Sequence, residues 1–288
     1  MLSFSTFFED VAYTPPDAIF ELTKDYKADP DTRKVNLGQG KDKNNYGNPW
    51  ILPAVKAVKE AIKNCEHEYL PTLGHPKFRK LVTELVFKMD STAIRESRCT
   101  QSKWLGSTAE QWTKIGALMK ERRLSSLFDA VYLGLTSGNY DEDAYAIRYF
   151  AEELNLEMGV CISFAKSMGI YGERAGLCAF VSRNHSIATN VESNLAQLIR
   201  GEISNPPAFG ARIFATVLED GGLFSQWQRD LATMSSGITG IRKRLFGELT
   251  ALGIANSHSF QHTVSPGTIF LPGTPGDGKK LTQQKGMF

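Results

Sequence analysis

The chain has 288 residues, 42% of them hydrophobic and 22% charged, which is typical of a soluble globular protein with a sizeable core. Its net charge of +2 and the lack of a dense lysine or arginine cluster argue against nucleic-acid binding, and we expect the triplet Arg242-Lys243-Arg244 to be a solvated face. No apolar run is long enough to cross a membrane, and the first ten residues lack the features of a secretory or mitochondrial leader, so a cytoplasmic protein is expected.

The cysteines of the chain indicate its redox setting. Cys65, Cys99, Cys161 and Cys178 show no CxxC spacing and no partnering histidines. This pattern argues against a zinc site, and we expect no metal site and reduced thiols in an intracellular compartment.

The N-terminal part predicts turns followed by two helices. Residues 1 to about 50 are expected to be irregular, because Pro15-Pro16 and Asp29-Pro30-Asp31 favour turns. Helices are predicted to begin at Pro53 and Pro76, since proline is favoured in the first turn of a helix. The residues expected on their buried faces are Val55, Val58, Ile62 and Cys65 in the first helix, and Phe78, Leu81, Val82, Leu85 and Met89 in the second.

A third helix and then an alternation of strands and helices follow. Thr108 and Gln111 form a capping-box pattern that opens a helix with Trp112, Ile115 and Met119 on its apolar face. Alternating strands and helices predict an α/β fold with a mostly parallel sheet. The predicted strands are 124–128, 160–165 and 177–182, and the predicted helices are 142–154 and 186–200.

A long amphipathic helix is predicted from Phe224 onward, because apolar residues recur there at steps of three and four. Its expected core stripe is Trp227, Leu231, Met234, Ile238, Ile241 and Leu245. Residues 254–272 show no periodicity and many turn residues, which favours a loop or an insertion.

Chemically informative residues stand at the ends of two predicted strands. Lys166 follows strand 160–165 and Asp129 ends strand 124–128, and in open α/β sheets such positions can face one crevice. Lys166 with Ser163 and Arg174 supplies an amine for a Schiff base and two phosphate ligands, as pyridoxal-phosphate enzymes require.

Two further roles belong to the same site. Asp129 is expected to keep a pyridinium nitrogen protonated, and Tyr132 to donate to the ring oxygen of the cofactor. Lys166 then also moves a proton at the substrate carbon. Each residue has a plain structural alternative when taken singly: a surface lysine, a helix N-cap aspartate, or an arginine paired with Glu173 or Glu192.

Several segments together resemble the aspartate aminotransferases, a family of pyridoxal-phosphate-dependent enzymes. The resemblance is to the eukaryotic cytosolic type. The resemblance lies in Asp29-Pro30-Asp31-Thr32-Arg33-Lys34-Val35-Asn36-Leu37-Gly38, Glu68-Tyr69-Leu70-Pro71, Phe128-Asp129-Ala130-Val131-Tyr132, residues 163–174 and Ser204-Asn205-Pro206-Pro207 followed by Gly210-Ala211-Arg212. It implies the three-layer, mostly parallel sheet of the fold-type I pyridoxal-phosphate transferases, and amino-group transfer between aspartate or glutamate and 2-oxoglutarate or oxaloacetate.

The resemblance also implies a role for each matching residue. Lys166 forms the Schiff base, Asp129 and Tyr132 hold the cofactor ring, and Ser163 and Arg174 hold its phosphate. In a homodimer with shared active sites, the partner subunit supplies Tyr69 to the phosphate and Arg200 to the distal substrate carboxylate. Gly40 lies against the substrate carboxylate.

Two regions depart from this family's pattern. Between Arg98 and Thr108 this chain lacks a segment that the family has. In the family, that segment brings the phosphate-binding turn, the aromatic residue stacked on the cofactor ring, and several strands. Residues 254–271 are atypical, and the expected arginine for the α-carboxylate lies beyond the last residue. We therefore expect an incomplete fold. Residues 1–45 would form an N-terminal arm and part of the small domain, and residues 241–288 the start of a small domain. Between them, residues 46–240 would form the large cofactor-binding domain, which lacks a segment near 99–107.

Two alternatives to an active aminotransferase follow from these departures. The first is an impaired or inactive variant, such as a splice product or pseudoenzyme, that acts as a dimer-interaction or cofactor-binding module. The second is a nicotinamide-dependent α/β enzyme, which is disfavoured because no GxGxxG follows a predicted strand.

Overall fold

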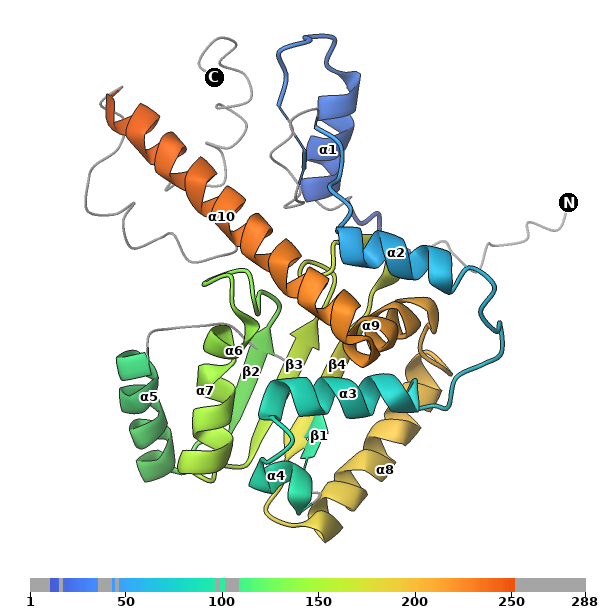
Figure 1. Cartoon of the computed structure of the whole chain (residues 1–288), viewed down its shortest axis with the longest axis vertical. Coiled ribbons are helices and arrows are strands. Elements are labelled where there is room, and N and C mark those ends of the chain that lie inside the picture. Colours follow the sequence, from blue (N-terminus) through green and yellow to red (C-terminus); the bar gives the residue numbers. More distant parts are fainter. Residues whose placement is uncertain are drawn as a thin grey trace, which may run out of the picture. The chain divides into compact units, whose positions relative to one another are not determined.

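The computed structural model describes residues 11–15, 18–35, 43–44, 47–96, 99–101 and 109–251 (Figure 1). The chain divides into two units, Met1–Lys41 and Asp42–Phe288. In the first unit, helix α1 spans Ala18–Ala28, so the prediction of an irregular N-terminal region was wrong there. The aspartate-rich turn after α1 matches the prediction, since the Asp29 carboxylate accepts a 2.8 Å hydrogen bond from the Asp31 amide.

The second unit contains a mixed four-stranded sheet in the order β1-β4-β3-β2. Its strands are β1 (Cys99–Gln101), β2 (Ser126–Ala130), β3 (Met158–Ser163) and β4 (Gly176–Val181). Among these strands β2 and β3 are parallel, whereas β4 is antiparallel to both β3 and β1. The α/β class is confirmed, but the expectation of a mostly parallel sheet was wrong for the described strands, because residues 164–175 join β3 to β4 without the long helical crossover that a parallel pair needs.

The two faces of the sheet differ in burial. Phe128, Val160 and Ala179 alternate onto a buried face, and Leu127 and Cys178 onto the opposite, exposed face. On the buried face the ring of Phe128 packs 5.7 Å from Trp112 and 4.8 Å from Phe150, measured between ring centroids. We call the opposite face, formed by residues 127, 129, 159, 161, 163, 176, 178 and 180, the open face.

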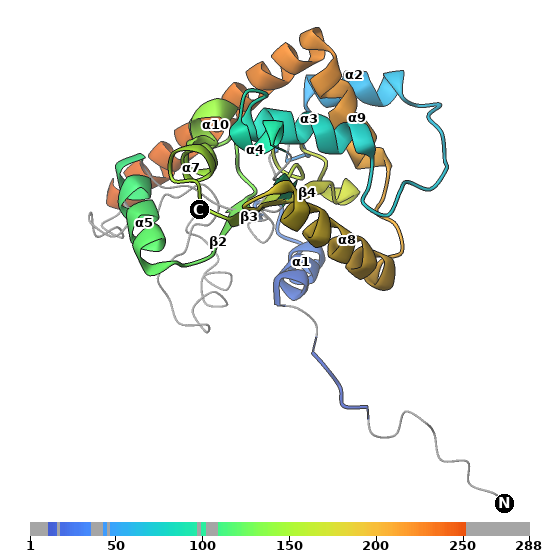
Figure 2. The ribbon, with the colours of Figure 1, turned by 90° about the horizontal axis from the view of Figure 1, so that it is seen from below.

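Helices surround the sheet, and two views show their arrangement (Figures 1 and 2). The helices predicted to begin at Pro53 and Pro76 are confirmed, and the proline occupies the first turn of each. The helices are α2 (Pro53–Ala61), α3 (Pro76–Phe87), α4 (Thr92–Arg95), α5 (Ala109–Arg122), α6 (Tyr140–Asp143), α7 (Tyr145–Arg148), the π-helical turn η1 (Tyr149–Glu153), the 3-10 turn η2 (Tyr171–Glu173), α8 (His185–Glu202), α9 (Phe209–Glu219) and α10 (Gly221–Ala251). Helix α9 was not predicted, and Thr108 of the capping-box pattern lies outside the described residues.

Three residues expected in the core are exposed instead. Met89 is 72% exposed because α3 ends at Phe87, after which Lys88 leaves the helical conformation with a positive φ of 67°. Ile115 is 38% exposed, since α5 turns Trp112 and Gly116 inward. Ile241 is 69% exposed, so the predicted apolar stripe of α10 does not continue through it.

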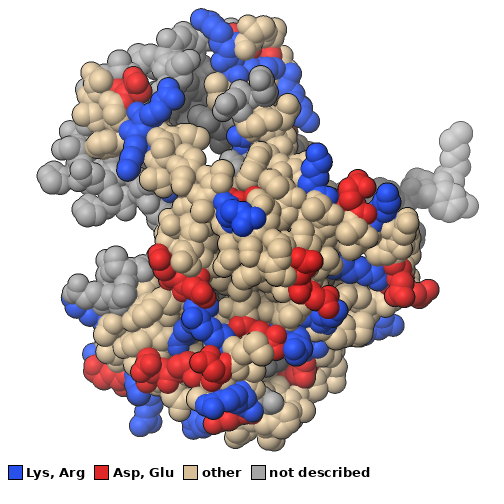
Figure 3. Space-filling view, viewed as in Figure 1, with Lys and Arg blue, Asp and Glu red and all other residues tan. Residues whose placement is uncertain are grey.

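Charged side chains of both signs are interspersed on the face shown in Figure 3. Ion pairs connect separate elements, as between Lys77 of α3 and Glu219 of α9 at 2.5 Å. Within the described residues no helix is long and apolar enough to span a membrane. Nor do the described residues contain a cluster of three or more histidine, cysteine, aspartate or glutamate side chains that could hold a metal ion.

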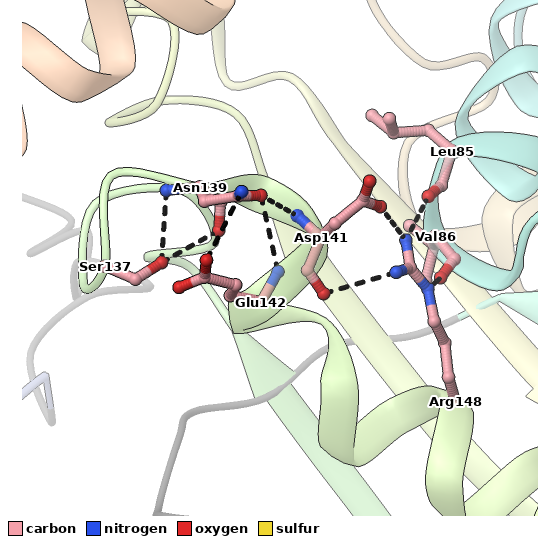
Figure 4. Close-up of polar contacts among 7 residues, drawn as sticks. All are labelled: Leu85, Val86, Ser137, Asn139, Asp141, Glu142 and Arg148. Atoms are coloured by element: carbon pink, nitrogen blue, oxygen red, sulfur yellow. Dashed lines mark hydrogen bonds and ion pairs between the residues drawn. The ribbon is translucent and has the colours of Figure 1, made fainter.

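Arg148 of α7 connects the end of α3 to the start of α6 (Figure 4). Its guanidinium donates to the carbonyl groups of Leu85 and Val86 at 3.0 and 2.8 Å, and to the carboxylate of Asp141 at 2.6 Å. These carbonyl groups belong to the last turn of α3 and have no partner within the helix. Arg148 therefore supplies hydrogen-bond donors to the last carbonyl groups of α3 and at the same time fixes the position of α6.

An aromatic cluster joins α3, α9 and α10 to the loop after β3. The rings of Phe164 and Phe214 stack with centroids 3.9 Å apart, and Trp227 meets Phe214 edge-on at 5.3 Å. The indole Nε1 of Trp227 donates a buried 2.9 Å hydrogen bond to the carbonyl oxygen of Ser167. This bond anchors the loop that carries Lys166 to the long helix α10.

Replacing Trp227 by phenylalanine tests this anchor. The variant keeps an aromatic ring but leaves the Ser167 carbonyl buried without its donor, so we expect a loss of about 1–3 kcal/mol in the free energy of unfolding. Urea denaturation measures the loss, with Gln228→Ala, at an exposed position of the same helix, as the control. Equal unfolding free energies for Trp227→Phe and the unsubstituted protein would contradict the assigned role.

Candidate functional site

The loop between β3 and β4 presents Lys166 from a rigid support. Phe164 and Met168 are fully buried and Ser167 is nearly so, whereas Lys166 between them is half-buried. The amide of Phe164 donates to the carbonyl of Ala175 at 3.0 Å, which closes the base of the loop. Because β3 ends at Ser163 rather than at residue 165, Lys166 lies in a turn and does not follow the strand directly as predicted.

Gly169 allows the tight turn after Lys166. Its φ of +60° lies in the left-handed region, and its amide donates to the Lys166 carbonyl at 3.0 Å. A Cβ atom at this position would lie 2.8 Å from Cδ1 of Leu52. The backbone conformation therefore favours glycine, and a larger residue would also force the Leu52 side chain to shift.

The structure brings together Lys166, Tyr132 and Asp129. The Nζ atom of Lys166 lies 4.8 Å from the centroid of the Tyr132 ring, within the range of a cation–π contact. Tyr132 follows β2, and Asp129 is the penultimate residue of β2, not a residue after the strand as predicted. Asp129 lies on the open face, in register with Cys161 of β3. The Lys166–Tyr132 contact joins the loop after β3 to the turn after β2, and a shared crevice for Lys166 and Asp129 stays a prediction.

The ionisation of Tyr132 depends on its surroundings. Burial raises the pKa of Tyr132, Arg242 of α10 opposes this increase, and the negative charge of Asp129 adds to it. Burial in turn lowers the pKa of Arg242, and Tyr132 opposes that decrease. Arg242 therefore belongs to the electrostatic environment of Tyr132, together with Asp129.

The sequence-based interpretation of Arg242 as part of a solvated face was wrong. Helix α10 packs on the loop after β2: Leu231 lies against Gly134, and the hydroxyl of Ser235 donates to the Thr136 carbonyl at 3.4 Å. Steps of three and four residues continue this face from Ser235 through Ile238 to Arg242. That spacing was visible in the sequence, but nothing there showed that this side of α10 meets the loop of Tyr132.

Ser163 and Arg174, the predicted phosphate ligands, lie at opposite ends of the Lys166 loop. Ser163 shares the open face with Asp129, and its hydroxyl accepts a 3.3 Å hydrogen bond from the amide of Ala165. Arg174 is exposed, has a left-handed backbone with φ of 49°, and donates to the Tyr171 carbonyl at 3.3 Å. The described contacts of Arg174 include neither Ser163 nor Lys166.

Tyr69 and Arg200, the residues predicted to act in the partner subunit, are connected to each other through Asn205. Tyr69 is 89% exposed, and Arg200 is exposed at the end of α8, where it donates to the Ser204 hydroxyl at 2.6 Å. The Asn205 side chain accepts from Arg200 at 3.5 Å and donates to the carbonyl of Leu70, next to Tyr69, at 2.7 Å. Gly40 lies outside the described residues.

Comparison with known proteins gives a consistent result. Residues 107–286 match the family described as aminotransferase class I and II. The cytoplasmic aspartate aminotransferase of Schizosaccharomyces pombe is 30% identical over 373 residues, covering 98% of this chain and 86% of the relative. That of Gallus gallus is 28% identical over 379 residues, covering 99% and 87%. Because these alignments are longer than the 288 residues of this chain and cover nearly all of it, the relatives carry internal positions that have no counterpart here.

Solved structures agree with the sequence relatives. The aspartate aminotransferase from the cytoplasm of Saccharomyces cerevisiae superposes with a TM-score of 0.78 at 29% identity, covering 86% of this chain and 83% of that one. The aromatic-amino-acid aminotransferase from Burkholderia pseudomallei, covalently bound to pyridoxal phosphate, gives a TM-score of 0.81 at 25% identity, covering 89% and 86%. The match over more than half of the sequence, together with the loop that presents Lys166 to Tyr132, establishes that this chain belongs to the class I and II aminotransferases.

Proposed function

We propose that this protein transfers amino groups between aspartate or glutamate and the corresponding 2-oxo acids, with pyridoxal phosphate as its cofactor. The observation that carries the proposal is the contact between the Lys166 amine and the Tyr132 ring, beside Asp129, in a chain of the aminotransferase family. Relatives named as aspartate aminotransferases support the choice of substrate, and so does Arg200, a cation suited to the second carboxylate of aspartate.

The residues of the site fit this cofactor chemically. Pyridoxal phosphate supplies, when bound, an aldehyde that reacts with an amine and a ring that withdraws electrons from the substrate. Lys166 is the amine on the loop, and once released it can hold and move a proton at the substrate carbon. Asp129 offers a carboxylate for the ring nitrogen, and Tyr132 a phenol for the ring oxygen. Ser163 and Arg174 are the two phosphate-binding candidates at the ends of the same loop.

The exposed pair of Tyr69 and Arg200 supports a homodimer. Both side chains lie on the surface, and Asn205 connects their segments. An exposed tyrosine and arginine on two segments joined by a hydrogen bond suit a site that is completed across a subunit interface. We propose that each subunit supplies Tyr69 and Arg200 to its partner. The cytoplasmic relatives favour the same compartment for this chain.

The absorbance of bound cofactor tests the role of Lys166. We expect pyridoxal phosphate to give a pH-sensitive visible band with the purified protein, and Lys166→Ala to abolish it because the substituted side chain has no amine. In an assay with aspartate and 2-oxoglutarate, the same variant should lose at least about 100-fold in turnover.

Lys120→Ala, which removes an exposed lysine in the last turn of α5, is the control and should leave both readouts unchanged. A protein without a visible band would overturn the proposed cofactor. A Lys166-dependent band without turnover would overturn the proposed transaminase activity and favour a cofactor-binding module.

Substitution of Arg242 tests the electrostatics around Tyr132. Arg242→Gln removes a cation that favours the phenolate, so the pKa of Tyr132 should rise further above its ordinary value of 10.0. Ultraviolet difference titration against Tyr132→Phe in each background isolates this one tyrosine. Arg244→Gln, at an exposed position two residues later, is the matched control and should leave the titration unchanged.

The direction of the linkage follows from the raised pKa. Since folding favours protonated Tyr132, its contribution to stability is complete below the ordinary pKa of 10.0 and is lost as the pH rises through the folded-state pKa. In Arg242→Gln this loss should extend to higher pH, because it begins at the unchanged unfolded-state pKa and ends at a folded-state pKa that is raised further. An unchanged titration of Tyr132 in Arg242→Gln would show that the two side chains do not interact.

A further inference from the structure

Two cysteines face each other across the strands that carry the Lys166 loop. In the antiparallel register of β3 and β4, Cys161 pairs directly with Cys178. Both belong to the open face; Cys178 is exposed and Cys161 half-buried. Neither takes part in a disulfide in the described structure. Their positions therefore depend on the strand register and not on a flexible loop.

The register also shows whether Cys161 and Cys178 form a hydrogen-bonded or a non-hydrogen-bonded pair of the antiparallel ladder. The amide of Phe164 donates to the carbonyl of Ala175, which identifies the pair Phe164 and Ala175 as hydrogen-bonded. Hydrogen-bonded and non-hydrogen-bonded pairs alternate along an antiparallel ladder, so the pair three positions away, Cys161 and Cys178, is non-hydrogen-bonded. The Cα atoms of such pairs lie about 4.5 Å apart, inside the range of roughly 4.4–6.8 Å that a disulfide bridges.

We propose that Cys161 and Cys178 form a site of reversible disulfide formation that closes the Lys166 loop. The bond would join β3 to β4 and enclose residues 162–177, among which are Ser163, Lys166 and Arg174. The bond adjoins the residues of the proposed cofactor site, but its formation requires neither cofactor nor substrate.

The oxidant is a small soluble disulfide such as oxidised glutathione. The Cys178 thiolate, the more exposed of the two, attacks one sulfur of glutathione disulfide and releases one reduced glutathione. The Cys161 thiolate then attacks the Cys178 sulfur of this mixed disulfide and releases the second glutathione. The two cysteines lose two electrons and two protons in total, and one glutathione disulfide becomes two thiols.

Thiol counting and peptide mapping test the proposal directly. After incubation of the folded protein with oxidised glutathione and then denaturation, we expect the four cysteine thiols to fall to two. Trypsin cleaves after Arg148, Lys166, Arg174 and Arg183, which places Cys161 and Cys178 in the separate peptides 149–166 and 175–183. Mass spectrometry without reductant should find these two peptides joined, and reductant should separate them.

Three variants make the experiment specific. Cys161→Ser and Cys178→Ser should each lose the joined peptides and carry glutathione adducts instead. Cys65→Ser, which removes a cysteine outside the sheet, is the matched control and should fall from three thiols to one. Oxidation should also raise the melting temperature by several degrees in Cys65→Ser, but not in the two sheet variants, because the bond restricts the unfolded chain. Joined peptides that contain Cys65 or Cys99, disulfides between two copies of the chain, or adducts without any internal bond would each overturn the proposal.

Discussion

The hydrogen bond from Trp227 to the Ser167 carbonyl, at the centre of the aromatic cluster, is the interaction on which the rest of the site depends. It joins the long helix α10 to the residue that follows Lys166, while the buried rings of Phe164 and Phe214 hold the start of the same loop. A lysine on such a loop has few ways to move its backbone, so its amine stays near Tyr132. Helix α10 contributes twice, because it also carries Arg242 toward Tyr132. The anchor and the electrostatic environment of the site are thus two parts of one helix.

The sequence allowed the chemistry to be predicted better than the architecture. Lys166, Asp129 and Tyr132 were predicted as a group from residue types and strand ends. The structure places Lys166 against Tyr132, and Asp129 acts on the pKa of Tyr132, although the boundaries of β2 and β3 were each displaced by two residues. The role of Arg242 beside Tyr132 was missed. Its neighbours Lys243 and Arg244 are exposed, and a run of three cations is typical of a solvated face. Only the packing of Leu231 and Ser235 on the loop of residues 134–138 shows which side of α10 faces inward. The antiparallel direction of β4 likewise depends on the path of the short loop 164–175. Strand propensity does not determine that path.

The internal segment that the relatives possess defines what is unusual about this chain. In the described residues the sheet ends at β2, and Leu127 of that strand is 61% exposed on the open face. An exposed leucine on a sheet face is apolar surface that a further layer of structure would cover. Yet the loop of Lys166 keeps its anchors, since these come from α3, α9 and α10, which all lie outside the gap. The site around Lys166 is therefore assembled without that segment.

Chemical trapping at Lys166 tests whether the site works without the missing segment. The folded protein is incubated with pyridoxal phosphate at a stoichiometric ratio and reduced with borohydride, and the modified lysines are located by mass spectrometry. If the loop holds a working site, the pyridoxyl group should be found on Lys166, and an excess of aspartate added before reduction should lower its yield. A modification spread over the exposed surface lysines, with Lys166 no more reactive than the others, would show that the loop holds no working site.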